Sequence, residues 1–124
     1  MPSPRAEALV VLVVCSDRNF QRFARATLRQ GGHTVFVTGV RPADVAVQVR
    51  LRAPSVVVLD IDHVDADAAR CGLGRIPIVE VCEEPEAAGP PALGKWESGS
   101  GLAVAVEDAA TASQRRSLMR VVQP

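Results

Sequence analysis

Short apolar runs rich in β-branched residues alternate along the chain with segments of helical periodicity. The apolar runs predict five strands, at Leu9 to Val14, Thr34 to Thr38, Val56 to Asp60, Ile76 to Cys82 and Leu102 to Val106. The third run has only apolar residues before Asp60, a pattern typical of a strand that is buried on both faces. Strands that alternate with helices indicate βαβ units, and the sequence therefore predicts an α/β domain with a parallel sheet.

The connection after the first strand has the clearest helical pattern. Side chains that suit a buried face recur there at spacings of three and four, at Phe20, Phe23, Ala24, Thr27 and Leu28. Asp17 is placed to cap this helix, and Gly31 and Gly32 are placed to end it. The pattern predicts a helix along one face of the sheet.

The other connections predict helices of different lengths. A second helix is expected from Pro42, a favoured first-turn residue, to about Leu51. A last helix is expected from about Glu107 toward the C-terminus. Between Asp67 and Cys71 there is room for only a turn or two, so the third helix should be short.

The segment 83–101 is expected to be an irregular loop in place of a regular fourth helix. It contains glycines at 89, 94, 99 and 101 and prolines at 85, 90 and 91, and both residue types interrupt helices. A loop of this length inside a compact domain is uncommon unless it is functional. Its aromatic residue, Trp96, is a candidate anchor for an interface.

The length of 124 residues fits a single domain over residues 1–124, with a flexible N-terminal segment 1–7. The formal net charge of +0 gives no global argument for binding to nucleic acid or to a membrane.

No apolar run approaches the roughly 20 residues of a membrane span, and the first residues lack the features of a signal peptide, so a cytoplasmic location is expected. Three cysteines, an odd number, argue against a disulfide framework.

Asp60 is the most informative polar residue, because it ends the strand that should be the most buried. Open α/β sheets bind ligands at the edge formed by the carboxyl ends of their strands. Residues that follow neighbouring strands should surround Asp60. The candidate pocket comprises Cys15, Ser16, Asp17, Asp60, Asp62 and Cys82. Two strand spacings should separate Cys15 from Cys82. This separation does not suit a disulfide or a zinc site, and no metal ligands are assigned.

With these residues in this order, the chain resembles the receiver domain of a bacterial two-component response regulator from Leu9 to Val122. The strand that ends at Asp60 matches the phosphoacceptor strand, and Gly32 to Val35 matches the entry to the second strand. Ile76 to Val79 matches the fourth strand. The resemblance implies the flavodoxin-like receiver fold, a doubly wound sheet of five parallel strands in the order 2-1-3-4-5.

The sequence departs from the receiver pattern at the residues that handle the phosphoryl group. By the resemblance, Cys15 and Ser16 stand where the family has an acidic pair that binds Mg²⁺, an ion that prefers hard oxygen ligands. Cys82 stands where the family has a hydroxyl residue. The family's Lys-Pro pair at the end of the fifth strand has no match at Val104 to Glu107, and Lys95 is expected in the loop before that strand.

These departures favour a pseudo-receiver that signals by protein–protein interaction, without conventional phosphorylation of Asp60. One alternative is a phosphorylation switch in which Asp60 is the phosphoacceptor and Asp17 with another acid forms a rearranged Mg²⁺ site. Another alternative is a domain gated by a small molecule or metal in the emptied pocket. No cofactor is expected except Mg²⁺ under the first alternative, and no motif indicates an enzyme.

Arginines gather on two of the expected helices although the net charge is +0. Arg18, Arg22, Arg25 and Arg29 have helical spacing on the first helix, and Arg115 and Arg116 lie on the last. The implied strand order puts both helices on one face of the sheet, where their arginines are expected to form one patch. This patch and Trp96 are the candidate surfaces for a protein partner in bacterial signalling. A homodimer is left open, and neither nucleic acid nor a membrane is expected as a partner.

Overall fold

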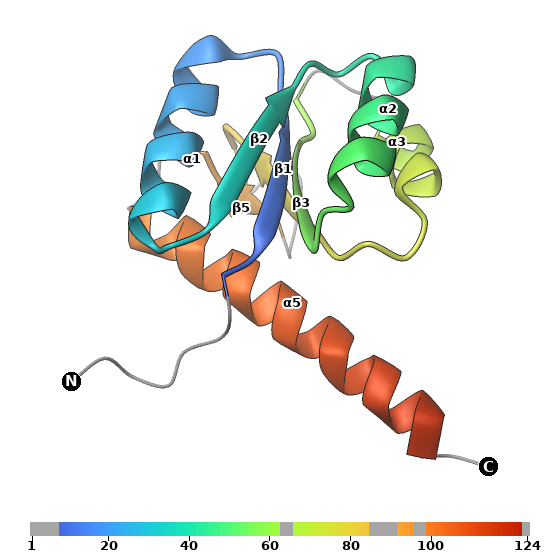
Figure 1. The fold of residues 1–124 in the computed structure, drawn as a ribbon. Coiled ribbons are helices and arrows are strands. Elements are labelled where there is room, and N and C mark those ends of the chain that lie inside the picture. Colours follow the sequence, from blue (N-terminus) through green and yellow to red (C-terminus); the bar gives the residue numbers. More distant parts are fainter. Residues whose placement is uncertain (1–7, 63–65, 85–91, 96–98, 123–124) are drawn as a thin grey trace.

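The computed structural model describes residues 8–62, 66–84, 92–95 and 99–122, and it places five strands in one sheet (Figure 1). The strands are β1 (Val10–Val14), β2 (Thr34–Thr38), β3 (Val56–Asp60), β4 (Ile78–Cys82) and β5 (Leu93–Gly94). Their order is β2-β1-β3-β4-β5, and all neighbouring strands are parallel. The fold class and strand order expected from the sequence are therefore confirmed.

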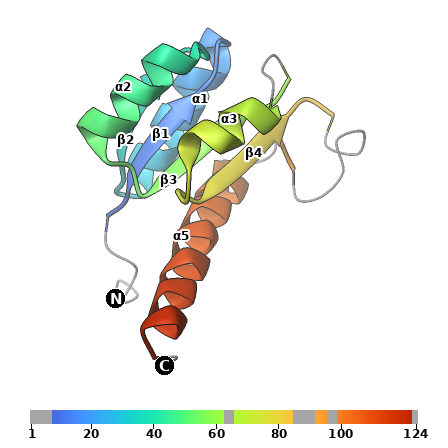
Figure 2. The same ribbon diagram turned by 90° about the vertical axis from the view of Figure 1, so that its right-hand side faces the viewer.

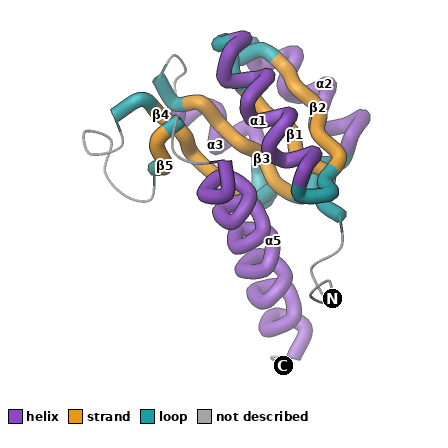
Figure 3. Tube along the Cα trace, turned by 90° about the vertical axis from the view of Figure 1, so that its left-hand side faces the viewer, coloured by secondary structure: helices purple, strands orange, loops and turns teal. Residues whose placement is uncertain are grey.

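The described helices cover both faces of the sheet. They are α1 (Arg18–Gln30), α2 (Pro42–Arg52), α3 (Ala66–Leu73) and α5 (Gly99–Val122). Helices α1 and α5 pack on one face, and α2 and α3 pack on the other (Figures 1 and 3). Strand side chains alternate between the faces, so Val11 and Val13 join the core under α1 and α5, whereas Leu12 and Val14 join the core under α2 and α3.

Three helices lie where the sequence predicts them. Asp17 caps α1, because its Oδ1 accepts hydrogen bonds from the backbone N–H groups of Asn19 (2.9 Å) and Phe20 (3.3 Å). Helix α2 begins at Pro42, as expected for a residue that lacks an N–H group. Helix α3 has 8 residues and is the shortest of the described helices, which confirms the expected short third helix.

The prediction of a fifth strand from Leu102 to Val106 is wrong. These residues belong to α5, which begins at Gly99 and not near Glu107. Leu102, Val106 and Ala110 are buried at a spacing of four, a period that places them on one face of a helix against the sheet and α1. A short run of apolar residues and alanine fits a buried helix face as well as a strand, and here packing against α1 favours the helix.

The prediction of an irregular loop over residues 83–101 is also corrected. This segment contains β5, in which Leu93 pairs with Val81 and Gly94 pairs with Cys82. It also contains the first turn of α5. Within its described part, residues 83–84, 92–95 and 99–101, no separate fourth helix is present. Trp96, like the N-terminal segment 1–7, lies outside the described residues.

Helix α5 extends beyond the end of the sheet, so that its C-terminal part stands apart from the other elements (Figures 1 and 2). His33 ties its middle to the domain. His33 Nδ1 accepts a hydrogen bond from the backbone N–H of Leu9 (3.1 Å), and His33 Nε2 donates to Glu107 Oε2 (3.0 Å). Among the residues that the structure describes, no helix is long and apolar enough to cross a membrane.

Candidate functional site

Asp60 lies at the end of the central strand β3, and its side chain is 1% exposed. Three groups donate hydrogen bonds to its carboxylate. Lys95 Nζ (2.9 Å) and Cys15 Sγ (3.1 Å) both approach Oδ2, and the backbone N–H of Asp62 donates to Oδ1 at 2.9 Å. The hydrogen bonds offset the cost of removing this carboxylate from water.

Lys95 directly follows β5, and its backbone N–H donates to the carbonyl oxygen of Cys82 (2.9 Å). This position sends the side chain back across the sheet edge, where Nζ lies 2.9 Å from Asp60 Oδ2 and 2.8 Å from Asp62 Oδ2. Burial alone would lower the pKa of the Lys95 ammonium, but its hydrogen bonds with Asp62 and Asp60 raise that pKa above its usual range. Lys95 is therefore a fixed positive charge.

The sequence interpretation of Lys95 is thus wrong, because that residue follows the last strand and does not precede it. The error has a simple cause: β5 has only two residues and therefore no periodicity, and the family's proline does not follow Lys95. One signal was available. Lys95 is the only lysine in a chain that otherwise uses arginine for its basic residues.

Cys15 is fully buried directly after β1 and contributes a neutral hydrogen-bond donor to the site. Its Sγ also accepts a hydrogen bond from the backbone N–H of Asp17 (3.2 Å). Burial raises the pKa of the Cys15 thiol to about 12, helped by the hydrogen bond to the Asp60 carboxylate. At neutral pH the thiol keeps its proton and donates it to Asp60.

The other candidate pocket residues have different surroundings. Ser16 is exposed, and Asp17 is engaged at the start of α1. Asp62 accepts a hydrogen bond from the backbone N–H of Glu83 (3.1 Å to Oδ2) and so joins the loops after β3 and β4. Cys82 is 3% exposed, and burial raises the pKa of its thiol. The structure therefore brings Cys15, Asp60, Asp62 and Cys82 to one edge of the sheet, together with Lys95.

The donor set of this cluster suits an ammonium group better than Mg²⁺. Mg²⁺ prefers several hard oxygen ligands, and a protonated thiol is not one of them. The two carboxylates of Asp60 and Asp62 already share the Lys95 ammonium. In the described part of the chain, no group of three or more His, Cys, Asp or Glu side chains has a geometry that could hold a metal ion.

The arginines that were expected to form one patch lie on α1 and α5. Arg18, Arg22 and Arg25 line a hollow of about 190 Å³ with Gln21 of α1 and Val37 of the edge strand β2. Arg115 and Arg116 are exposed on the C-terminal half of α5. Helices α1 and α5 share one face of the sheet and contact each other, and α5 also contacts β3 and β4.

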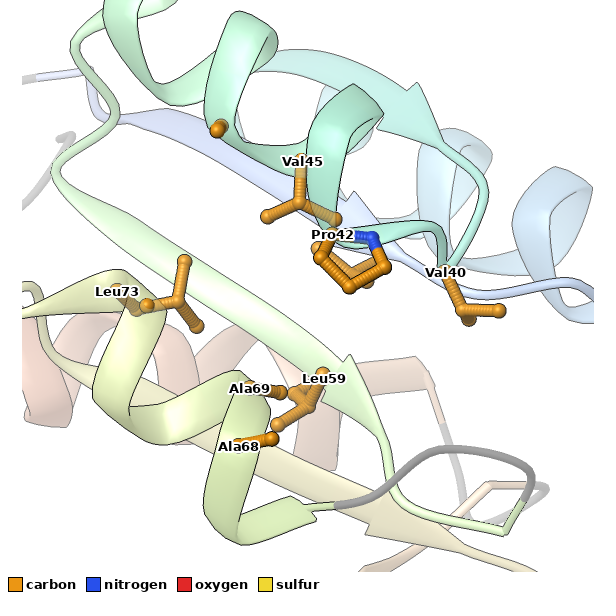
Figure 4. Close-up of a pocket in the computed structure, with 10 residues that line it drawn as sticks. Val40, Pro42, Val45, Leu59, Ala68, Ala69 and Leu73 are labelled. Atoms are coloured by element: carbon orange, nitrogen blue, oxygen red, sulfur yellow. The ribbon is translucent and has the colours of Figure 1, made fainter.

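A second cavity, of about 340 Å³, lies between α2 and α3 (Figure 4). Its walls are apolar: Val14, Val40, Pro42, Val45, Ala46, Leu59, Ala68, Ala69, Gly72 and Leu73. Small residues on both helices leave this space unfilled. The apolar pattern of the sequence did not predict this cavity, although the small residues Ala68, Ala69 and Gly72 on a short helix were a signal. Leu59 and Val14 in its floor directly precede Asp60 and Cys15.

Comparison with known proteins adds to this geometry. No family model matches the chain, and no curated protein matches it. Among solved structures, the anti-anti-sigma factor PhyR from Bartonella quintana has a TM-score of 0.74 and 16% identity, and the match covers 96% of this chain and 53% of that chain. NtrX from Brucella abortus in complex with ATP has a TM-score of 0.80 and 20% identity, covering 94% of this chain and 30% of that chain.

A CheY-like response regulator receiver domain protein from Methanospirillum hungatei JF-1 has a TM-score of 0.69 and 13% identity. That match covers 89% of this chain and 99% of that chain. The chain thus spans nearly the whole of that receiver domain protein, about half of PhyR and less than a third of NtrX. The strand order, the buried Asp60 at the end of β3 and these similarities together give the chain the fold of the response-regulator receiver domains.

Proposed function

We propose that the chain is a receiver-like signalling domain that acts through protein contacts and is not driven by conventional phosphorylation of Asp60. One observation carries the proposal. Asp60 Oδ2 receives both the Lys95 ammonium (2.9 Å) and the Cys15 thiol (3.1 Å), in a site that is closed to solvent. An incoming phosphoryl group would have to displace at least one of these donors before it reached the carboxylate.

The chemistry of phosphoryl transfer supports the same conclusion. The reacting oxygens need a cation that neutralises the charge of the phosphoryl group, and in receivers the resemblance assigns this role to Mg²⁺ on an acidic pair. Cys15 and Ser16 occupy those positions, and burial keeps the Cys15 thiol neutral.

Lys95 then has the role of a permanent counter-ion. One ammonium group between two carboxylates joins the ends of β3 and β5 without any added ion or phosphoryl group. We therefore propose a constitutive module with a protein partner, in a bacterial cytoplasm, and with no enzymatic activity of its own. The PhyR match supports a role of this kind, because that protein is described as an anti-anti-sigma factor, which acts on another protein.

The test is the intact mass of the chain after incubation with Mg²⁺ and acetyl phosphate. We expect no phosphoryl adduct on the native chain under conditions that modify an ordinary receiver. An adduct that is present on the native chain and absent from Asp60→Ala would contradict the proposal and establish the phosphorylation switch. The variant Cys15→Asp/Ser16→Asp is the matched control, because it rebuilds the acidic pair around an unchanged Asp60.

The apolar cavity supports a second candidate function, a receiver gated by a small molecule. The ligand would not sit among Cys15, Asp60 and Cys82, which are each at most 3% exposed. It would occupy the space between α2 and α3, whose volume of about 340 Å³ falls in the range of small-molecule sites. A rise in melting temperature with indole or benzene that disappears in Ala69→Leu would support gating, and equal rises in both proteins would oppose it.

A further inference from the structure

Strand β2 is an edge strand, because β1 is its only neighbour in the described sheet. The backbone N–H of Thr34 donates to Leu9 O (2.9 Å), and Thr38 O accepts from the N–H of Cys15 (3.1 Å). In a parallel ladder, alternate residues direct both backbone groups toward the same neighbour. Thr34, Phe36 and Thr38 therefore face β1, and the N–H and C=O groups of Val35 and Val37 face outward.

Within the described residues, β2 itself has no lysine, proline or bulge that would protect its outward side against a further strand. Natural edge strands are commonly protected by lysine, proline or a bulge. The sequence Thr34 to Thr38 is instead uncharged and consists of β-branched and aromatic residues, and its pairing with β1 runs in unbroken register. This edge is ready to accept a hydrogen-bonded partner strand.

Positive charge flanks the edge on both faces of the sheet. On the α1 face, Arg18, Arg22 and Arg25 line a hollow together with Val37. On the α2 face, the guanidinium of Arg52 lies over the ring of Phe36, 4.2 Å from its centroid. The helix α1 has no acidic residue, and α2 has only Asp44. The helices beside this edge therefore carry a clear excess of arginine.

We propose that the β2 edge binds an extended acidic peptide segment of a partner protein as an additional strand. The peptide backbone would pair with Val35 and Val37, and its side chains would alternate between the two faces of the sheet. Carboxylates on one face meet the arginines of α1, and those on the other meet Arg52. The inference names a partner for the protein-binding module proposed above and rests on that proposal.

The backbone groups of the edge favour a peptide over a nucleic acid. Val35 and Val37 present carbonyl oxygens as well as N–H groups, which match the alternating donors and acceptors of another strand. Phosphate oxygens are acceptors only, and the edge carbonyls would repel them. A nucleic acid would bind through the arginines alone, without using the strand edge.

The experiment measures fluorescence anisotropy of a labelled octapeptide that alternates Glu and Thr, added to the intact chain. As a strand, this peptide has all its carboxylates on one face, and it therefore tests the contact with the arginines of α1. We expect saturable binding that weakens about tenfold in Arg22→Gln/Arg25→Gln, the loss expected for two exposed ion pairs. Arg115→Gln/Arg116→Gln removes the same charge at a distance from β2 and should bind as the native chain does. The same octapeptide with alternate N-methyl groups cannot form the ladder and should not bind, without any change to the protein.

Four outcomes would overturn the proposal. They are no binding of the octapeptide, equal binding of its N-methylated form, equal weakening in Arg115→Gln/Arg116→Gln, and equally tight binding of a single-stranded oligonucleotide of the same charge. None of these outcomes depends on whether Asp60 accepts a phosphoryl group. Failure here would therefore leave the mass test of the proposed function intact, and a phosphoryl adduct in that test would leave the edge-binding result intact.

Discussion

The ammonium nitrogen of Lys95 lies 2.9 Å from Asp60 Oδ2 and joins the end of the last strand to the end of the central strand. Both side chains are 1% exposed. Two buried charges are tolerated only when each compensates the other and their remaining hydrogen-bonding capacity is used. Here Asp62 and Cys15 complete the set, with contacts of 2.8 Å to Lys95 and 3.1 Å to Asp60.

Replacement of Lys95 by methionine should strongly destabilise the chain. Lys95→Met keeps most of the length of the side chain but leaves the Asp60 carboxylate buried without a counter-ion. Removal of one partner of a buried ion pair costs about 3–5 kcal/mol. Urea unfolding of the native and variant chains measures the loss. Asp60→Asn added to Lys95→Met should recover most of it, and a similar loss in the single and double variants would contradict the pairing.

Local sequence patterns predicted most of the sheet, because β1 to β4 each carry a complete pattern within five residues. The apolar run before Asp60 and the cap at Asp17 needed no knowledge of distant residues. The prediction failed at β5, whose two residues carry no period. It failed also at Leu102 to Val106, where a run of apolar residues and alanine satisfies both the strand and the helix pattern until packing against α1 is known.

The candidate site was predicted only in part, because some of its residues follow strands with a clear local pattern and others do not. Asp60, Cys15 and Cys82 were placed by the strands they follow, and these strands were correctly located. Lys95 was missed because its role depends on the position of β5, an element formed only by pairing with β4. The cavity between α2 and α3 was missed because it results from what two helices fail to fill, which is a property of tertiary packing.

The chain should lose stability as the pH rises above about 9. Burial raises the pKa of Cys15 from 9.0 to about 12, so within this window the folded chain keeps a proton that the unfolded chain releases. The free energy of unfolding then falls by about 1.4 kcal/mol per pH unit for such a thiol. The Lys95 ammonium acts in the same direction above its unfolded pKa of 10.5, because the pKa of Lys95 is raised in the folded chain.

The free energy of unfolding in urea should be measured at several pH values between about 8 and 10. In this range Lys95 contributes little to the pH dependence, because the pH stays below the pKa of Lys95 in the unfolded chain. Cys15→Ala should reduce the slope but not abolish it, since burial raises the pKa of Cys82 as well. An identical slope in the native chain and in Cys15→Ala would show that the Cys15 thiol is not the group that titrates.

The three cysteines should differ sharply in reactivity. Cys71 is exposed on α3, whereas Cys15 and Cys82 are 0% and 3% exposed and have raised pKa values. The thiolate is the reactive form, so a disulfide reagent at neutral pH should modify one thiol rapidly and the other two only on unfolding. Cys71→Ser should remove the fast phase. A fast phase that survives this change but disappears in Cys15→Ala would mean that the site around Asp60 is open to solvent.

Two glycines at the end of α3 should respond in opposite ways to alanine. Gly72 is helical and lines the cavity, and an added methyl group would meet no atom within 4 Å, so Gly72→Ala should stabilise the chain by about 0.5–1 kcal/mol. Gly74 has a φ of +64°, where a side chain is strained, so Gly74→Ala should cost about 1–2 kcal/mol. Thermal unfolding of both variants compares the signs directly. A destabilising Gly72→Ala would mean that the wall of the cavity packs more closely than this geometry indicates. A neutral Gly74→Ala would contradict the left-handed backbone conformation of Gly74 after α3.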